Sequence, residues 1–222
     1  MFKWLQRPNA ETSLDEIHRE FLGMLDDGRH IFDAAANCLV GGTDPEVIRA
    51  DLFATDDRIN RVEQSIRREI VVHGSVHGSP TFPGLLVMMS LVKDAERIGD
   101  YAKNLFDLAV KGGGFHDEEE RRRLVDAKDR ISKMLVRARS LCETQDVESA
   151  RKFTWEADSV ADECDSAIDR LLAFEGGNPS TAVLTHRYFK RVVGHLSNIV
   201  SSIFMPVDKL DFFDEPRSKP NP

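Results

Sequence analysis

The stretch DAERIGDYAKNLFDLA, residues 94–109, places two carboxylates at a spacing that could do chemistry. Glu96 and Asp100 are four residues apart, so in a helix they lie on one face, one turn from each other. Two like charges at this spacing repel by roughly 0.2–0.5 kcal/mol. The pair therefore indicates either neighbouring cations that offset the repulsion or a positively charged ligand.

A third carboxylate could complete such a ligand site. Asp57 lies in TDDRINRVEQ, residues 55–64, which has helical spacing of its own. If this helix lies beside the first one, Asp57 joins Glu96 and Asp100 in an oxygen-rich site. Carboxylate oxygens suit hard or borderline cations such as iron, manganese, magnesium or calcium.

An ordinary mesh of surface ion pairs is the alternative. Lys93 lies three residues before Glu96, and Lys103 lies three residues after Asp100. Exposed pairs of this kind contribute little to stability. On a helical wheel the two acids lie nearly opposite the apolar side, so we expect both to be accessible. That apolar side is formed by Met88, Leu91, Ala95, Ile98, Ala102 and Leu105.

The elements that position these residues are helices. Apolar residues recur at helical spacing along the chain, and few segments alternate apolar and polar residues. The pattern predicts an all-α protein, with HGSVHGSP (73–80) as a loop and three glycines (112–114) as the clearest linker. Six helices are expected. The first runs from about Leu14 to the glycines at 41–42, the second from Pro45 through Ile70, and the third over about 83–110. The fourth starts near Asp117, the fifth covers roughly 147–174, and the sixth runs from about 181 toward 204.

The two halves of the chain are weakly similar. A shift of 101 residues places Asp57 on Asp158 and Ile98 on Ile199, while the first helices need a shift of 110. Three helices followed by three helices indicate an internal repeat. We expect one repeat over 10–111, a second over 115–212 and a disordered tail over 213–222.

Composition excludes several classes of function. The net charge of −8 argues against a nucleic-acid surface, which needs a basic stripe. The three cysteines are far apart and no CxxC is present, which argues against a zinc cage or a disulfide scaffold. No apolar run approaches the ~20 residues that cross a bilayer, and no secretory signal is recognisable. These features favour a cytoplasmic protein without membrane insertion.

Enzyme signatures are missing from the sequence. It has no P-loop, no GxGxxG, no HExxH and no glutamate followed three residues later by histidine. No serine, cysteine or histidine stands in a nucleophile motif. We therefore expect a protein that acts by binding and not by catalysis.

The segment DAERIGDYAKN closely resembles the signature of the PhoU family, regulators of phosphate uptake. The family pattern is Leu-Glu-Arg-Ile-Gly-Asp-His-Ala-x-Asn-Ile, from which this chain departs at Ala95 and Tyr101. DDRINRVEQSI, starting at Asp56, resembles the second-helix pattern of the family. EADSVADECD, starting at Glu156, resembles the same pattern in the second half.

This resemblance implies a PhoU-like six-helix bundle and metal ions, divalent or of iron type, on an acidic surface of each repeat. The implied ligands in the first repeat are Asp57, Glu96 and Asp100. A second, doubtful site would use Asp158 and Asp162. It lacks the acidic pair, because Ser197 and Ser201 stand 101 residues after that pair.

The resemblance also implies a role. Family members connect the ATPase of a high-affinity phosphate transporter to a phosphate-sensing histidine kinase, which they restrain when phosphate is plentiful. By resemblance we expect the same partners here, in the cytoplasm, with a homodimer plausible from the apolar residues on several helices. An accessory protein of a low-affinity phosphate permease and a metal-binding helical bundle are the alternatives.

Overall fold

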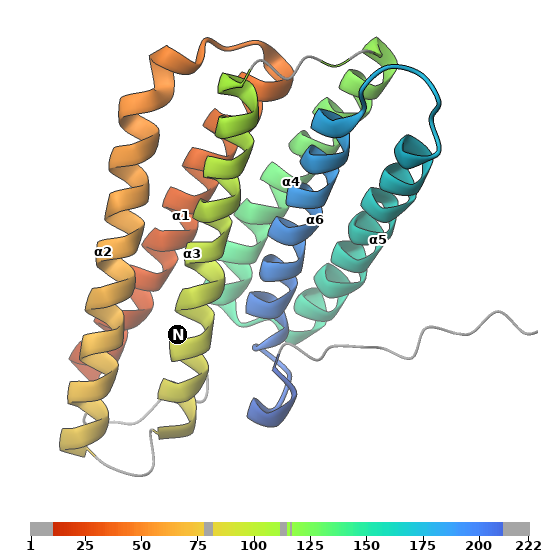
Figure 1. Ribbon diagram of the computed structural model, residues 1–222. Coiled ribbons are helices and arrows are strands. Elements are labelled where there is room, and N and C mark those ends of the chain that lie inside the picture. The colour runs from red at the N-terminus through yellow and green to blue at the C-terminus, as the bar shows by residue number, and fades with distance from the viewer. Residues whose placement is uncertain (1–10, 78–81, 112–114, 116, 211–222) are drawn as a thin grey trace, which may run out of the picture.

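The structure is a computed structural model that describes residues 11–77, 82–111, 115 and 117–210. Its described part is all-α and contains no strand, which confirms the predicted fold class (Figure 1). The helices are α1 (Glu11–Gly41), α2 (Pro45–His77), α3 (Phe82–Val110), α4 (Glu118–Thr144), α5 (Val147–Leu172) and α6 (Ser180–Ser201), followed by the short 3₁₀ helix η3 (Val207–Lys209).

Helix boundaries follow local signals in the sequence. After α1, Gly42 adopts a positive φ of 79°, a conformation that glycine reaches without strain. Asp44 then accepts a hydrogen bond from the backbone N–H of Glu46 at 2.9 Å, as an N-cap residue does. The N-caps of α4 and α5 are likewise aspartates, Asp117 and Asp146.

The C-terminal end of α2 differs from the expected loop over 73–80. The helix continues through His73 and Gly74 to His77, and both His73 and Gly74 are buried. A Cβ on Gly74 would lie 3.2 Å from the ring of Phe82 at the start of α3. Packing between α2 and α3 thus outweighs the low helix propensity of this segment.

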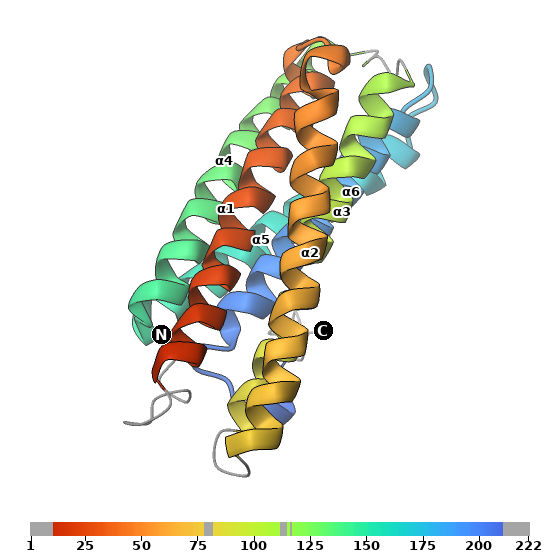
Figure 2. The same cartoon turned by 90° about the vertical axis from the view of Figure 1, so that its left-hand side faces the viewer.

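The helices form two groups of three that lie side by side (Figures 1 and 2). Helices α1 to α3 pack against one another, and α6 packs against both α4 and α5. The groups meet through α3 with α6 and through α1 with α4. Asp94 of α3 hydrogen-bonds His195 of α6 at 2.7 Å, and these two residues coincide under the 101-residue shift. This contact is expected of two repeats related by an approximate two-fold axis.

A single hydrophobic core runs through both groups. Phe32 of α1 packs against Phe189 of α6 with ring centroids 5.7 Å apart. The largest buried side chains include Phe21, Phe32, Phe106, Phe153 and Phe189. The two groups therefore share their core, and the exact limits of the two repeats stay a prediction. The expected disordered tail lies outside the described residues.

The cysteines lie within this core. Cys38, Cys142 and Cys164 are all buried and unbridged. Burial raises the pKa of Cys142 and of Cys164 to about 12, so both thiols stay protonated and unreactive. Among the described helices, none combines the length and the apolar character that crossing a membrane demands.

Candidate functional site

Glu96 and Asp100 lie on the flank of α3 that faces α2. Glu96 is only 9% exposed, so the expectation that it is accessible is wrong. Gly99 explains why α2 comes so close, because a Cβ there would lie 3.4 Å from side-chain atoms of Ile31 and Ile59. The face opposite the apolar side of α3 is therefore partly covered by α2 instead of open to solvent.

The acidic residues that meet this flank are Asp56 and Glu63 of α2, both buried. They follow the same helical phase as Leu52, Ile59 and Ile66, the inner face of α2. A wheel of α2 would therefore have identified them from the sequence. We call Asp56, Glu63, Glu96 and Asp100 together the acidic seam.

Asp57, the ligand expected from the sequence, lies on a different face of α2. Its side chain is exposed, whereas the neighbouring Asp56 is 7% exposed. Asn60 donates a hydrogen bond to Asp56 at 3.3 Å, one turn further along the same face. The structure thus links Asp100 to Asp56 through Lys103 and Glu96 to Glu63 through Lys93, while Asp57 lies on another face.

Lys103 connects the two helices at one end of the seam. Its Nζ lies 2.9 Å from Oδ2 of Asp56 and 3.1 Å from Oδ1 of Asp100. Burial by itself would lower the pKa of Lys103, but the hydrogen bonds to both aspartates outweigh burial and raise it. Arg97 adds a second cation to Asp100 at 3.2 Å. Lys103 therefore remains charged between its two acidic partners.

Lys93 has the same role at the other end. Its Nζ lies 2.6 Å from Oε2 of Glu96 and 3.9 Å from Oε1 of Glu63. Arg67 approaches Glu63 to 3.0 Å. Burial raises the pKa of Glu96, and the nearby acids add to this effect, while Lys93 opposes it. The repulsion between the acids is thus offset by cations from the chain itself.

This arrangement bears on whether the seam fits a metal ion. Carboxylate oxygens are suitable donors, and one oxygen each of Glu63 and Glu96 is buried without a hydrogen bond. However, each of those oxygens has Lys93 as an ionic neighbour, and Lys103 fills the space between the aspartates. Over the described ranges, no group of three or more His, Cys, Asp or Glu is placed to hold a metal ion. The residues as arranged do not fit a metal centre, and the ligand set stays a prediction.

Comparison with known proteins identifies this half of the molecule. Residues 21–109, which run from α1 to the end of α3 and include the whole seam, match the family model described as PhoU domain. This part of the chain is therefore similar to a PhoU domain. A search of curated proteins found no match.

The fold extends the likeness beyond that domain. The crystal structure of PhoU from Pseudomonas aeruginosa matches with a TM-score of 0.75 and covers 86% of this chain and 95% of its own. The sequence identity is 20%, so the match concerns the fold. It includes helices of the second half, which lie outside the matched PhoU domain.

The second half does not repeat the acidic seam of the PhoU domain. Asp158 and Asp162, the residues of the doubtful second site, are exposed on α5. At the 101-residue shift the buried Cys164 stands where Glu63 does, and Ser197 stands where Glu96 does. A second ligand set stays a prediction, with fewer acidic residues than in the first half.

Tyr101, where the PhoU signature has a histidine, belongs to the contact between the two halves. Its ring stacks on His195 with centroids 5.7 Å apart, and its hydroxyl accepts a hydrogen bond from Arg191 at 3.0 Å. Asp94 accepts from Asn198 at 3.2 Å in addition to its bond with His195. His195 is therefore a packed, hydrogen-bonded residue of the α3–α6 interface.

Proposed function

We propose that the chain regulates phosphate uptake and phosphate-responsive signalling as a non-enzymatic adaptor between a high-affinity phosphate transporter and a sensor histidine kinase. The observation that carries this proposal is the PhoU domain at residues 21–109. A PhoU domain indicates a role in phosphate regulation, and the fold likeness over 86% of the chain supports a complete PhoU-like bundle.

The ion pairing of the carboxylates and the protonation of the buried thiols support a binding role for the protein. The carboxylates of the acidic seam are engaged with Lys93, Lys103, Arg67 and Arg97, so none is held ready as an acid or base. The buried thiols of Cys142 and Cys164 stay protonated. A protein of this kind would act through its surfaces, alone or as a homodimer.

One end of the PhoU domain offers a surface for a partner. Large apolar side chains are exposed on the last turns of α2 and the first turns of α3, on either side of the connection between them. Exposed apolar groups gathered in one region are typical of interaction surfaces. They are Val71, Val72, Val76, Phe82 and Leu86.

Capture of purified partners tests this proposal. Tagged protein is mixed with the transporter ATPase and, separately, with the cytoplasmic part of the kinase. Val76→Asp should weaken capture of at least one partner, because Val76 is 70% exposed at the proposed surface. Val47→Asp is the matched control, since Val47 is 76% exposed at the opposite end of the same helix.

Two results would count against the adaptor. Failure to capture either partner, together with unchanged phosphate control in a deletion strain, would refute it. Capture of a low-affinity permease in place of both partners would favour the accessory role instead.

A further inference from the structure

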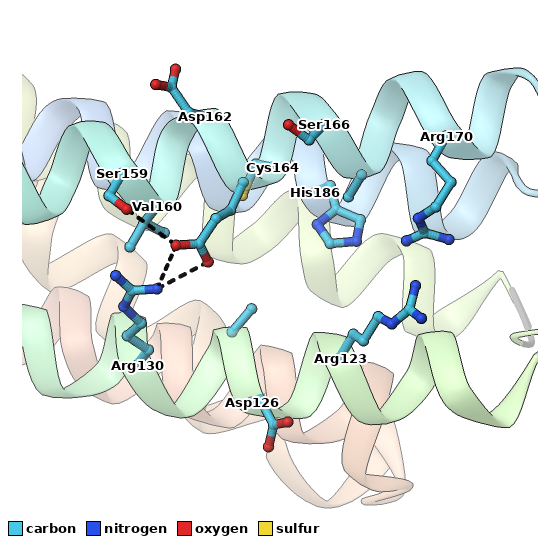
Figure 3. A pocket seen from close by; sticks show the side chains of 13 residues that line it. Arg123, Asp126, Arg130, Ser159, Val160, Asp162, Cys164, Ser166, Arg170 and His186 are labelled. Atoms are coloured by element: carbon cyan, nitrogen blue, oxygen red, sulfur yellow. Dashed lines mark hydrogen bonds and ion pairs between the residues drawn. The ribbon is translucent and has the colours of Figure 1, made fainter.

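Helices α4 and α5 diverge, in contrast to α1 and α2, which pack along each other. A groove of about 840 Å³ lies between them. Ala127, Val160 and Cys164 contribute small or apolar side chains to its lining. The ring of His186 lies between the two helices (Figure 3). The second half thus has a groove where its first two helices diverge.

Positive side chains gather at one end of this groove. Arg123 of α4 and Arg170 of α5 approach each other across it, with His186 beside them (Figure 3). Asp126 and Asp162 also border the groove, but their carboxylates point away from it (Figure 3). Glu163 also lines the groove, where it pairs with Arg130 at 2.9 Å.

The buried carboxylate of Glu120 contacts Arg170, His186 and Arg123. Glu120, 3% exposed, accepts a hydrogen bond from Arg170 at 2.6 Å and contacts Nε2 of His186 at 2.7 Å. Arg123 lies 3.7 Å from the same carboxylate and also pairs with the exposed Glu119. Two guanidinium groups and an imidazole thus surround a single buried acid, and the half-exposed arginine side chains border the groove.

His186 brings an unused hydrogen-bonding atom to this end. Burial by itself would raise the pKa of Glu120, but its bonds with His186 and Arg170 outweigh burial, so the pKa is lowered and Glu120 is ionised. Burial lowers the pKa of His186, so its ring is neutral at pH 7. Because an ionised carboxylate only accepts hydrogen bonds, Nε2 must be the donor and Nδ1 an acceptor. Nδ1 is buried and has no hydrogen-bond partner.

We propose that this end of the groove binds hydrogen phosphate. Arg123 and Arg170 bind oxygens of the anion, as guanidinium groups bind phosphate elsewhere. The hydroxyl of the anion donates to Nδ1 of His186. Nδ1 is buried in the structure, so this hydrogen bond requires a rearrangement on binding. The half-exposed side chains of Arg123 and Arg170 change conformation so that the anion reaches Nδ1.

The neutral acceptor makes this site selective. Sulfate carries no proton at neutral pH, so it would leave Nδ1 without a partner and lose one hydrogen bond. A monoester such as methyl phosphate has a second pKa near ~6, so at pH 7.5 it too has mostly lost its proton. A site built around a ligand hydroxyl discriminates strongly against analogues that lack it. The site therefore prefers inorganic phosphate to both.

Isothermal titration calorimetry of the full chain at pH 7.5 in phosphate-free buffer tests this inference. We expect inorganic phosphate to bind at least about tenfold more tightly than sulfate or methyl phosphate. This comparison uses the wild-type protein alone and does not depend on any variant folding. Equal affinity for phosphate and sulfate would overturn the role of His186, and no heat with millimolar phosphate would overturn the site.

A variant pair locates the site. Arg123→Gln should weaken phosphate binding by at least about tenfold, because it removes a charge-assisted contact. Arg122→Gln is the matched control, since Arg122 is the exposed neighbour on α4 and does not line the groove. An equal loss in both variants would mean that nonspecific charge, and not the groove, attracts the anion. The assay measures ligand binding only, so its failure leaves the proposed adaptor function standing.

Discussion

At the scale of single residues, Lys103 is the most informative position in the acidic seam. Its ammonium group neutralises Asp56 and Asp100 together, at 2.9 and 3.1 Å. Lys103→Met keeps most of the apolar stem but leaves the buried Asp56 without its cation. We expect the free energy of unfolding to fall by about 1–3 kcal/mol, measured by urea denaturation.

An exposed lysine provides the control for that change. Lys152 is 65% exposed and pairs with Glu148, which is 83% exposed. Lys152→Met should change the free energy of unfolding by less than about 0.5 kcal/mol. Equal changes in the two lysine variants would mean that the seam is not a stabilising network.

The same lysines make a prediction about metals. Because Lys93 and Lys103 already supply positive charge to the carboxylates, we expect the wild-type protein and Glu96→Gln/Asp100→Asn to carry the same metal content after purification without chelator. Elemental analysis measures this. Metal in the wild type that vanishes in the double variant would instead support the ligand set expected from the sequence.

The sequence contains part of this site. The pairs of Lys93 with Glu96 and of Asp100 with Lys103 follow from their spacing on one helix. Asp56 belongs to the site only in the structure, because the family pattern points to Asp57 and spacing within α2 does not say which side chains of α3 it meets. Lys93 and Lys103, the cations that offset the repulsion between Glu96 and Asp100, are therefore close to them in sequence. The acids on the facing helix come close only through tertiary packing.

At the scale of helices, Gly23 of α1 and Gly99 of α3 have opposite roles. Gly99 lies where α1, α2 and α3 meet, and a Cβ there would already lie 3.4 Å from Ile31 and Ile59. Gly99→Leu should therefore lower the free energy of unfolding by about 1–3 kcal/mol or more, through overpacking. Thermal and urea unfolding measure the change.

Gly23 is the matched glycine without this constraint. A Cβ on Gly23 would meet nothing within 4 Å, and the residue is exposed in the middle of α1. Gly23→Ala should raise the free energy of unfolding by about 0.5–1 kcal/mol, because alanine has the higher helix propensity. Destabilisation at Gly23, or tolerance of leucine at Gly99, would contradict the packing described here.

The helices themselves were largely predictable, because their ends carry local signals. Gly42, Asp44 and Asp117 end or cap helices where the sequence indicates. The end of α2 was not predictable from local signals, since Gly74 remains helical where it packs closely against Phe82. Local propensity therefore fails at the point where tertiary packing dominates.

At the scale of the whole molecule, stability should depend on pH through His18. This histidine is 7% exposed, and burial is the main cause that lowers its pKa to about 4. In the unfolded chain it takes up a proton near its ordinary pKa of 6.5, so acid favours unfolding. Its contribution is complete above pH 6.5 and is lost as the pH falls toward 4.

Urea denaturation at pH 7 and pH 5 measures this contribution. We expect the free energy of unfolding to fall by about 1–2 kcal/mol from His18 between these values. His18→Leu should show a smaller difference between the two pH values. An unchanged pH dependence in that variant would assign the effect to other groups, such as His186, whose pKa is also lowered.

The sequence predicted two three-helix halves and the loss of the acidic pair in the second, but not the difference in how their helices pack. The shift of 101 residues aligns α3 with α6, and Asp94 and His195 meet as expected of related positions. The groove between α4 and α5 had no signature, because it arises from the divergence of two helices and not from any residue pattern. Such a groove depends on the angles at which helices pack, and the spacing of apolar residues in the sequence does not determine these angles.

The measurement that tests the proposed function most directly is phosphate uptake in a strain from which this gene has been deleted. A regulator that restrains uptake when phosphate is plentiful predicts that the deletion strain takes up labelled phosphate faster in phosphate-rich medium, and that the wild-type gene restores the lower rate. Identical uptake in the parent, deletion and complemented strains at high and low phosphate would contradict a role in phosphate regulation.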